Sequence, residues 1–168
     1  AKPIAHNTDF HDEASETIPN YCDAGLTVQL DTVLDGQFLF NPHGPDGVPY
    51  FHLNAHFTAV FTNLDNGNTV TRAGKFVNKD LRVTDNGDGT LTVLNLDTGF
   101  FNVYGPDGKT PDSKAIARDS GQVRLKALFD QNGTPNDPFD DEVISAELVK
   151  VTGRTDDICA AEVPLLVG

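Results

Sequence analysis

Residues 50–83 read YFHLNAHFTAVFTNLDNGNTVTRAGKFVNKDLRV, two alternating segments joined by a tight-turn sequence. In the first segment Phe51, Phe57 and Phe61 share one side with small apolar residues, and polar side chains occupy most of the other. A period of two is typical of a strand with one buried face. The join at 65–68, DNGN, supplies the positive φ angles that a two-residue hairpin turn requires. This stretch therefore predicts a β-hairpin.

The same pattern continues on both sides of this hairpin. Further turn sequences occur at 44–47, 85–89 and 105–108, and a fifth at 130–133 opens a longer acidic loop. Between them, alternation predicts strands at 26–40, 123–129 and 143–151, and two shorter strands within 90–104. Residues 114–118 fit a strand or a short helix, and we favour the strand. Gly36, Gly74 and Gly99 interrupt the strands and indicate bends.

Strands this long would leave exposed edges unless the sheet closed or split into two layers. We therefore predict an all-β, single-domain antiparallel meander over residues 1–168 that closes into a barrel of roughly eight strands. A two-layer β-sandwich is the alternative, and the central glycines favour the barrel. Residues 1–20 are expected to form a peripheral strand or a loose arm, and the tail at 160–168 to lie against the body.

Composition narrows the function classes. The 168 residues include 11 Phe but neither Trp nor Met, and 12 basic against 25 acidic residues give a net charge of −13. This charge opposes nucleic acids and anionic lipid surfaces as partners. No segment approaches the roughly 20 apolar residues of a membrane span, so we expect no membrane insertion. A chain that begins at Ala1 is expected to be secreted, with a leader removed, and extracellular.

The chain has two cysteines, Cys22 and Cys159. In an exported protein they would form one disulfide between the two ends of the chain. Two unpaired thiols are the alternative. Neither cysteine has the neighbouring ligands that a structural zinc site needs.

Several short motifs carry a resemblance to a known group of proteins. They are HFTA at 56–59, TNLDNG at 62–67, YGPDGK at 104–109, GTPNDP at 133–138 and TGR at 152–154. Through them, residues 25–160 resemble small exported bacterial β-domain proteins of unassigned activity. The resemblance implies an exported β-domain and no particular chemistry. By architecture alone, the chain is also similar to small barrels of the lipocalin and allene-oxide-cyclase kinds.

The polar side of residues 50–58 is the first candidate site. If it faced a barrel interior, it could bind a ligand or transfer a proton; otherwise it is a solvated surface. His52 and His56 are about 13 Å apart on one strand, too far to share a metal ion. Weak catalytic candidates are His52 and His56 together with Arg72, with Asp97 as an acid. The candidate ligand-binding residues are Tyr50, His52, Asn54, His56 and Thr58.

The acidic loop at 130–142 is the second candidate site. Its oxygen-bearing side chains suggest calcium, although the EF-hand order is absent and a solvated turn explains them equally. The candidate metal ligands are Asp130, Asn132, Asp137, Asp140 and Asp141. Apart from this calcium alternative, we expect no cofactor.

No motif in the chain specifies a reaction. The favoured hypothesis is an exported β-barrel binding module for a small apolar ligand or an extracellular protein partner. The alternatives are a cofactor-free barrel enzyme, of isomerase or cyclase type, that uses a lumenal histidine, and a self-assembling structural protein of the cell exterior. An enclosed polar volume favours the enzyme, and a large self-contact favours the assembly.

Overall fold

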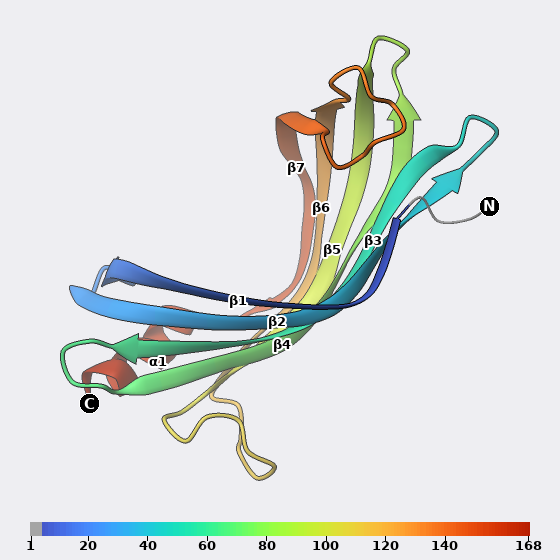
Figure 1. Cartoon of the computed structure of the whole chain (residues 1–168). Helices are drawn as coiled ribbons and strands as arrows, with labels where there is room; N and C mark the ends of the chain where they lie inside the picture. Colours follow the sequence, from blue (N-terminus) through green and yellow to red (C-terminus); the bar gives the residue numbers. More distant parts are fainter. Residues whose placement is uncertain (1–4) are drawn as a thin grey trace.

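The computed structural model describes residues 5–168, which form seven antiparallel strands in one sheet and one helix (Figure 1). The strands follow one another in chain order across the sheet, which confirms the predicted meander. Their bounds are β1 (Ala5–Tyr21), β2 (Leu26–His43), β3 (Val48–Asn63), β4 (Thr69–Asp85), β5 (Thr90–Tyr104), β6 (Ala117–Asp130) and β7 (Glu142–Thr155), and α1 spans Ile158–Val167.

The strand register places the apolar side chains of neighbouring strands on one common face. Leu30 on β2 lies opposite Phe61 on β3, and Phe61 lies opposite Val70 on β4. Residues directly opposite in an antiparallel pair point to the same side, so the alternation in each strand adds up to one apolar face. This inner face carries the fully buried Val28, Val70 and Val103. We call the other side of the sheet the outer face.

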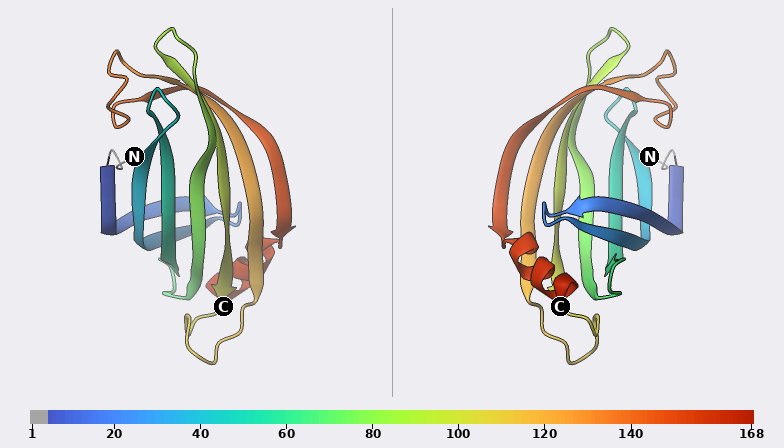
Figure 2. Two further views of the ribbon diagram at one scale, coloured as in Figure 1. Left: turned by 90° about the vertical axis from the view of Figure 1, so that its right-hand side faces the viewer. Right: turned by 90° about the vertical axis from the view of Figure 1, so that its left-hand side faces the viewer.

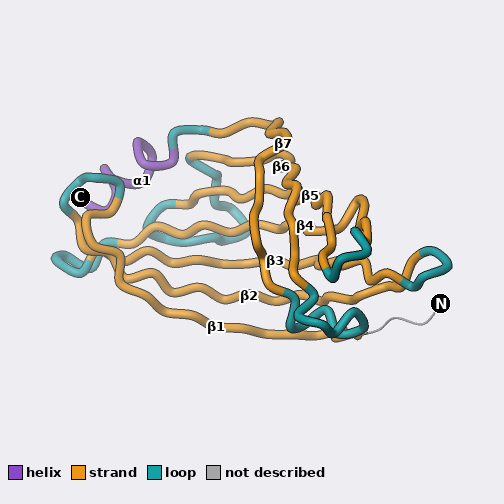
Figure 3. The backbone as a smooth tube through the Cα atoms, turned by 90° about the horizontal axis from the view of Figure 1, so that it is seen from above, coloured by secondary structure: helices purple, strands orange, loops and turns teal. Residues whose placement is uncertain are grey.

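A row of mostly small residues, interrupted by Phe76 on β4 and ending at Phe10 on β1, crosses the middle of the sheet. Gly36 lies opposite Ala55, and on the far strands Gly99 lies opposite Gly121, which lies opposite Gly153. A Cβ atom at Gly36 would come within 2.5 Å of the Asn54 carbonyl oxygen, so the strands here approach too closely for a larger residue. The sheet bends about halfway along its strands (Figures 1 and 3). The predicted bends at Gly36 and Gly99 fall on this row, which we call the crease.

The crease divides the sheet into two halves. The helix-covered half contains the turns at 22–25 and 64–68, and α1 contacts β3, β4, β5 and β6 there. Its core is made of Tyr21, Val28, Ala59, Phe61, Val70 and Leu166. The open half contains the turns at 44–47 and 86–89 and the loop at 131–141. Figure 2 shows α1 at one end of the molecule and this loop at the other.

The predicted closure into a barrel of about eight strands is not observed. The sheet has seven strands, β1 and β7 are its edges, and they do not pair with each other. The strands also form one sheet, so the two-layer sandwich is wrong for residues 5–168. A disulfide links the two edges instead of strand pairing. It joins Cys22, directly after β1, to Cys159 in the first turn of α1, the helix that follows β7. The helix thus covers apolar surface that a closed barrel would have enclosed.

Of the two alternatives for the N-terminal segment, the peripheral strand is observed: residues 5–21 form an edge strand, while residues 1–4 lie outside the described part. Two local predictions need revision. Residues 90–104 form one strand through Gly99, not two. Residues 114–116 are loop and β6 begins at Ala117, so only the last two residues of the strand expected at 114–118 belong to a strand.

The apolar tail lies against the body, as expected, and it does so as a helix. The Asp157 side chain caps α1 by accepting a hydrogen bond from the Ala160 amide at 2.9 Å. Gly168 ends the helix at a φ of 94°. Within residues 5–168, α1 is the one helix, and its 10 residues are too few to cross a bilayer.

Candidate functional site

The inner face of the open half lines a half-open cavity of about 400 Å³. Ligand sites for small molecules commonly occupy roughly 300–1,000 Å³ and are mostly apolar with a few polar groups. This cavity has that character. Its lining consists of Phe40, Pro49, Phe51, Asn78, Asp80, Val83, Leu91, Val93, Asn95, Leu125, Ala127, Phe129, Pro138, Asp141, Val143 and Ala146.

Aromatic rings form one wall of the cavity. The rings of Phe40 and Phe51 lie with centroids 5.2 Å apart on neighbouring strands. Phe139, from the loop at 131–141, packs edge-on against Phe40 at 5.5 Å and against Phe38 at 6.4 Å. The loop therefore folds back over the sheet and brings Pro138 and Asp141 to the cavity.

Internal hydrogen bonds hold this loop in place. The Asn132 side-chain amide donates to the Asp140 carbonyl oxygen at 2.6 Å, and the Thr134 hydroxyl donates to the Asp140 carboxylate at 2.6 Å. The Asp137 carboxylate accepts from the Phe139 amide at 3.1 Å. These oxygens stabilise the turns of the loop, as Asp and Asn side chains commonly do.

The five candidate calcium ligands do not include a cluster of three acidic side chains. Four of them use side-chain groups in hydrogen bonds within the loop: Asp130, Asn132, Asp137 and Asp140. The fifth, Asp141, lines the cavity. Within residues 5–168 no three acidic, histidine or cysteine side chains come together as a metal site. The dense acidic sequence is thus explained by turn formation.

Three polar side chains form a connected group on the cavity wall. The Asp80 carboxylate accepts a hydrogen bond from the Phe51 amide at 2.8 Å and another from the Asn95 side chain at 3.1 Å. Asn95 also donates to the Asn78 side-chain oxygen at 2.9 Å. Burial raises the pKa of Asp80, and these two hydrogen bonds only partly offset the effect.

A second carboxyl group, that of Asp141, reaches the cavity from the loop. Its pKa is raised, first by partial burial and then by repulsion from Asp140, Asp137 and Asp130. The cavity thus brings two acids with raised pKa values into an apolar setting.

The sequence prediction missed this polar group, although the chain carries one signal for it. Asn95 lies in phase with Leu91 and Val93 on the apolar side of its strand, and a polar residue on an apolar face indicates a buried polar contact. Asp80 was harder to find, because a β-bulge between Asp80 and Arg82 changes the phase of β4 just beyond it.

The predicted histidine row lies on the outer face, away from the cavity. His52, Asn54, His56 and Thr58 are all exposed. Tyr50 is half-buried and its ring lies 4.4 Å from that of His43. The alternate residues of the same strand, such as Phe51, point inward instead. Asn54 and His56 line one open hollow of about 490 Å³, and Tyr50 and His52 line another of about 410 Å³, so the structure does not bring the five candidate ligand-binding residues together at the cavity of the open half.

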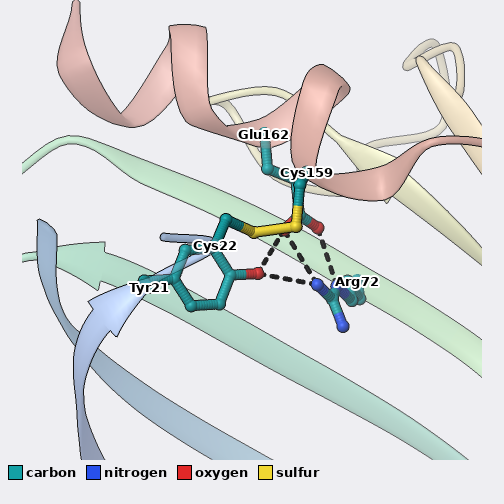
Figure 4. Close-up of polar contacts among 5 residues, drawn as sticks. All are labelled: Tyr21, Cys22, Arg72, Cys159 and Glu162. Atoms are coloured by element: carbon teal, nitrogen blue, oxygen red, sulfur yellow. Dashed lines mark hydrogen bonds and ion pairs between the residues drawn. A yellow bond between two sulfur atoms is a disulfide. The ribbon is translucent and has the colours of Figure 1, made fainter. Parts of the chain in front are cut away.

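Arg72 lies on the inner face of the helix-covered half, within a buried polar cluster (Figure 4). Its guanidinium donates two hydrogen bonds to the Glu162 carboxylate, at 2.7 and 2.8 Å, and one to the Tyr21 hydroxyl at 2.7 Å. Tyr21 in turn donates to Glu162. The guanidinium also stacks over the Phe61 ring at 4.4 Å.

This cluster is saturated by its own contacts. Glu162 is fully buried, and burial, followed by the bond to Glu162, raises the pKa of Tyr21. Arg72 and His56 lie on opposite faces of the sheet, so the proposed catalytic grouping of these residues is not assembled. Arg72 instead fixes α1 to the sheet.

The predicted disulfide is confirmed. Cys22 and Cys159 are bonded, with Cα atoms 5.7 Å apart and a sequence separation of 137. The bond lies beside the Tyr21–Arg72–Glu162 cluster (Figure 4). Covalent and ionic links therefore hold α1 at the same place.

Comparisons with family models, with curated proteins and with solved structures found no match to this chain. The site's chemistry must therefore be inferred from its own residues.

Proposed function

We propose that this protein is an exported binding module that holds a small apolar ligand in the cavity of its open half. The observation that carries the proposal is the cavity itself, about 400 Å³ of mostly aliphatic and aromatic lining with one connected polar group. In the helix-covered half the equivalent surface is filled by α1. In the open half, among the described residues, the loop at 131–141 lies over part of it.

The setting we propose is extracellular, of the kind that the turn motifs suggest for small exported bacterial β-domains. A disulfide between the chain's two ends persists in oxidising compartments. A net charge of −13 favours solubility and keeps copies apart. Both properties support this setting.

A neutral fluorescent probe, Nile red, tests the proposed cavity. We expect saturable binding at one site, and we expect Ala127→Phe, which fills the cavity, to weaken it by about 10-fold or more, as loss of several apolar contacts implies. Thr84→Phe is the control, since it adds the same ring on an exposed position of β4 outside the lining. Absence of saturable binding, or equal affinity in the two variants, would refute the proposal.

A second candidate, self-association, is favoured by the β7 edge. All 14 residues of β7 are exposed, and Val143, Leu148 and Val151 are each about 60% exposed on the inner face. An edge of this kind presents unpaired backbone groups to another strand. The β1 edge differs, because it carries Asp9, Asp12, Glu13 and Glu16 without a lysine or arginine over 9–21.

The occupant of this edge would be the β7 strand of a second copy, in antiparallel pairing. A two-fold axis between Leu148 and Val149 would set Glu147 of each copy opposite Lys150 of the other, so the charges match. Light scattering during gel filtration should then show a dimer that Val151→Lys converts to monomer, while Thr17→Lys on β1 leaves it intact. A monomer at all concentrations up to the millimolar range would exclude this candidate.

The enzyme alternative draws no support from the histidines. His52 and His56 are exposed on the outer face, where each lines an open hollow, and neither lines the cavity of the open half. A binding role requires only the cavity.

A further inference from the structure

The charge of the cavity indicates the chemical class of its ligand. Among its 16 lining residues, two are aspartates and two are asparagines, and none is lysine, arginine or histidine. The other 12 are apolar. A pocket for fatty acids or other anions would require a basic residue to balance their charge. This one offers hydrogen-bond acceptors, amides and negative charge.

Asp80 retains capacity for a further partner. A carboxylate can accept about four hydrogen bonds, and Asp80 accepts two, one at each oxygen, from the Phe51 amide and the Asn95 side chain. Neither donor is charged. Among the ion pairs of residues 5–168, none includes Asp80 or Asp141.

Removal from water is therefore only partly compensated at Asp80. Burial raises its pKa, because the ionised form loses hydration that neutral donors only partly replace. A cation bound beside the carboxylate would restore the lost stabilisation and add a charge-assisted hydrogen bond. Asp141 on the loop would supply a second negative charge at the same cavity.

We propose that the ligand is a cationic amphiphile, an apolar chain or ring that carries a protonated amine. The ammonium group donates to the Asp80 carboxylate, and the apolar part lies along the aromatic wall that includes Phe40 and Phe51. The net charge of −13 adds long-range attraction for a cation. This inference rests on the proposed apolar binding function and specifies its ligand.

Three ligands with the same ten-carbon chain test the inference: decylamine, decan-1-ol and decanoate, each titrated by calorimetry at pH 7 below its micelle concentration. We expect decylamine to bind about 10-fold or more tightly than decan-1-ol, because a hydrogen bond to a charged group replaces a neutral one. Decanoate should bind most weakly, since its charge repels both aspartates.

Asp80→Asn should remove the preference for the amine, so that decylamine binds no more tightly than decan-1-ol, because the charge of the carboxylate is lost while the size of the side chain is kept. Asp65→Asn makes the same change of net charge in a turn of the helix-covered half, and it should preserve the preference. If Asp80→Asn does not fold, Asp141→Asn replaces it, with a smaller loss of amine affinity expected because Asp141 is only half-buried.

The outcomes separate this inference from the function on which it rests. Equal affinity for the amine and the alcohol, or tightest binding of decanoate, would overturn the cationic ligand while leaving apolar binding in place. Failure of all three ligands and of Nile red would overturn both. A preference for the amine that survives Asp80→Asn would mean that Asp80 does not recognise the ammonium group.

Discussion

The two halves of this sheet are built from the same strands and the same alternation, yet they finish differently. In the helix-covered half the inner face packs against α1, and Leu166 is fully buried there. In the open half Phe40 and Phe51 stay half-buried around a cavity. The difference lies in what covers the apolar face, and it separates a region that stabilises the fold from one that is available to a ligand.

Two acids of the inner face show the same contrast. Glu162 in the helix-covered half is matched by Arg72 at 2.7 Å and by Tyr21. Asp80 in the open half has only neutral donors. An acid with a cation partner maintains structure, whereas one without a cation leaves a place for a charged ligand.

The largest effect should come from the disulfide. Its 137-residue separation implies that Cys22→Ser with Cys159→Ser lowers the free energy of unfolding by about 5 kcal/mol on the chain-entropy model. Urea unfolding with and without reductant measures this, and reductant should not affect the double variant. Binding of Nile red at low urea should persist, because the bond lies outside the cavity. A loss of less than about 1 kcal/mol would contradict the role given to this bond.

The second-largest loss in the free energy of unfolding should come from breaking the ion pair between Arg72 and Glu162. Glu162→Leu leaves the Arg72 guanidinium without its carboxylate and is expected to cost about 3–5 kcal/mol. Adding Arg72→Met should recover part of that loss, since both charges are then absent. A double-mutant cycle by urea unfolding tests the coupling, and strictly additive losses would show that the two residues act independently.

A pair of phenylalanines compares the two halves directly. Phe61→Ala empties a core position that is 4% exposed and should cost about 3 kcal/mol. Phe139→Ala removes a ring that is 63% exposed and should cost about 1 kcal/mol, through its contacts with Phe38 and Phe40. Nile red affinity should fall more in Phe139→Ala than in Phe61→Ala, because Phe139 lies on the loop beside the cavity. Equal stability losses would mean that the loop is as much a part of the core as β3.

The smallest effect is a pH dependence at Asp80. Its pKa in the folded protein is raised by burial, so the native state holds this proton more tightly than the unfolded chain does. Its ionisation therefore destabilises the fold as pH rises from the unfolded pKa of about 3.9 through the raised folded value. Asp80→Asn should remove this loss, and melting temperatures of both proteins from pH 4 to 7 would detect it. Parallel curves would contradict the raised pKa.

Local features were predictable from the sequence because their causes are local. The expected turns occur, with positive φ at Gly67 and Gly87, but they span 64–68 and 86–89 and so are longer than the predicted two-residue hairpin turn. The alternation in 50–63 identified Phe51 and Phe61 as inward-facing. The helix at 158–167 was not predicted as such, because its sequence ICAAEVPLLV is apolar without a helical period and contains Pro164.

By itself, the sequence determined an antiparallel meander with one apolar face, bends at central glycines and a disulfide between the two ends. Each of these depends on neighbouring residues or on a single possible pairing. Only the tertiary structure decided that the sheet stays open, that α1 covers one half, and that Asp80 and Asn95 meet in the other. Those outcomes depend on the curvature and the bulges of all seven strands together. A pattern within one segment of the sequence does not contain that information.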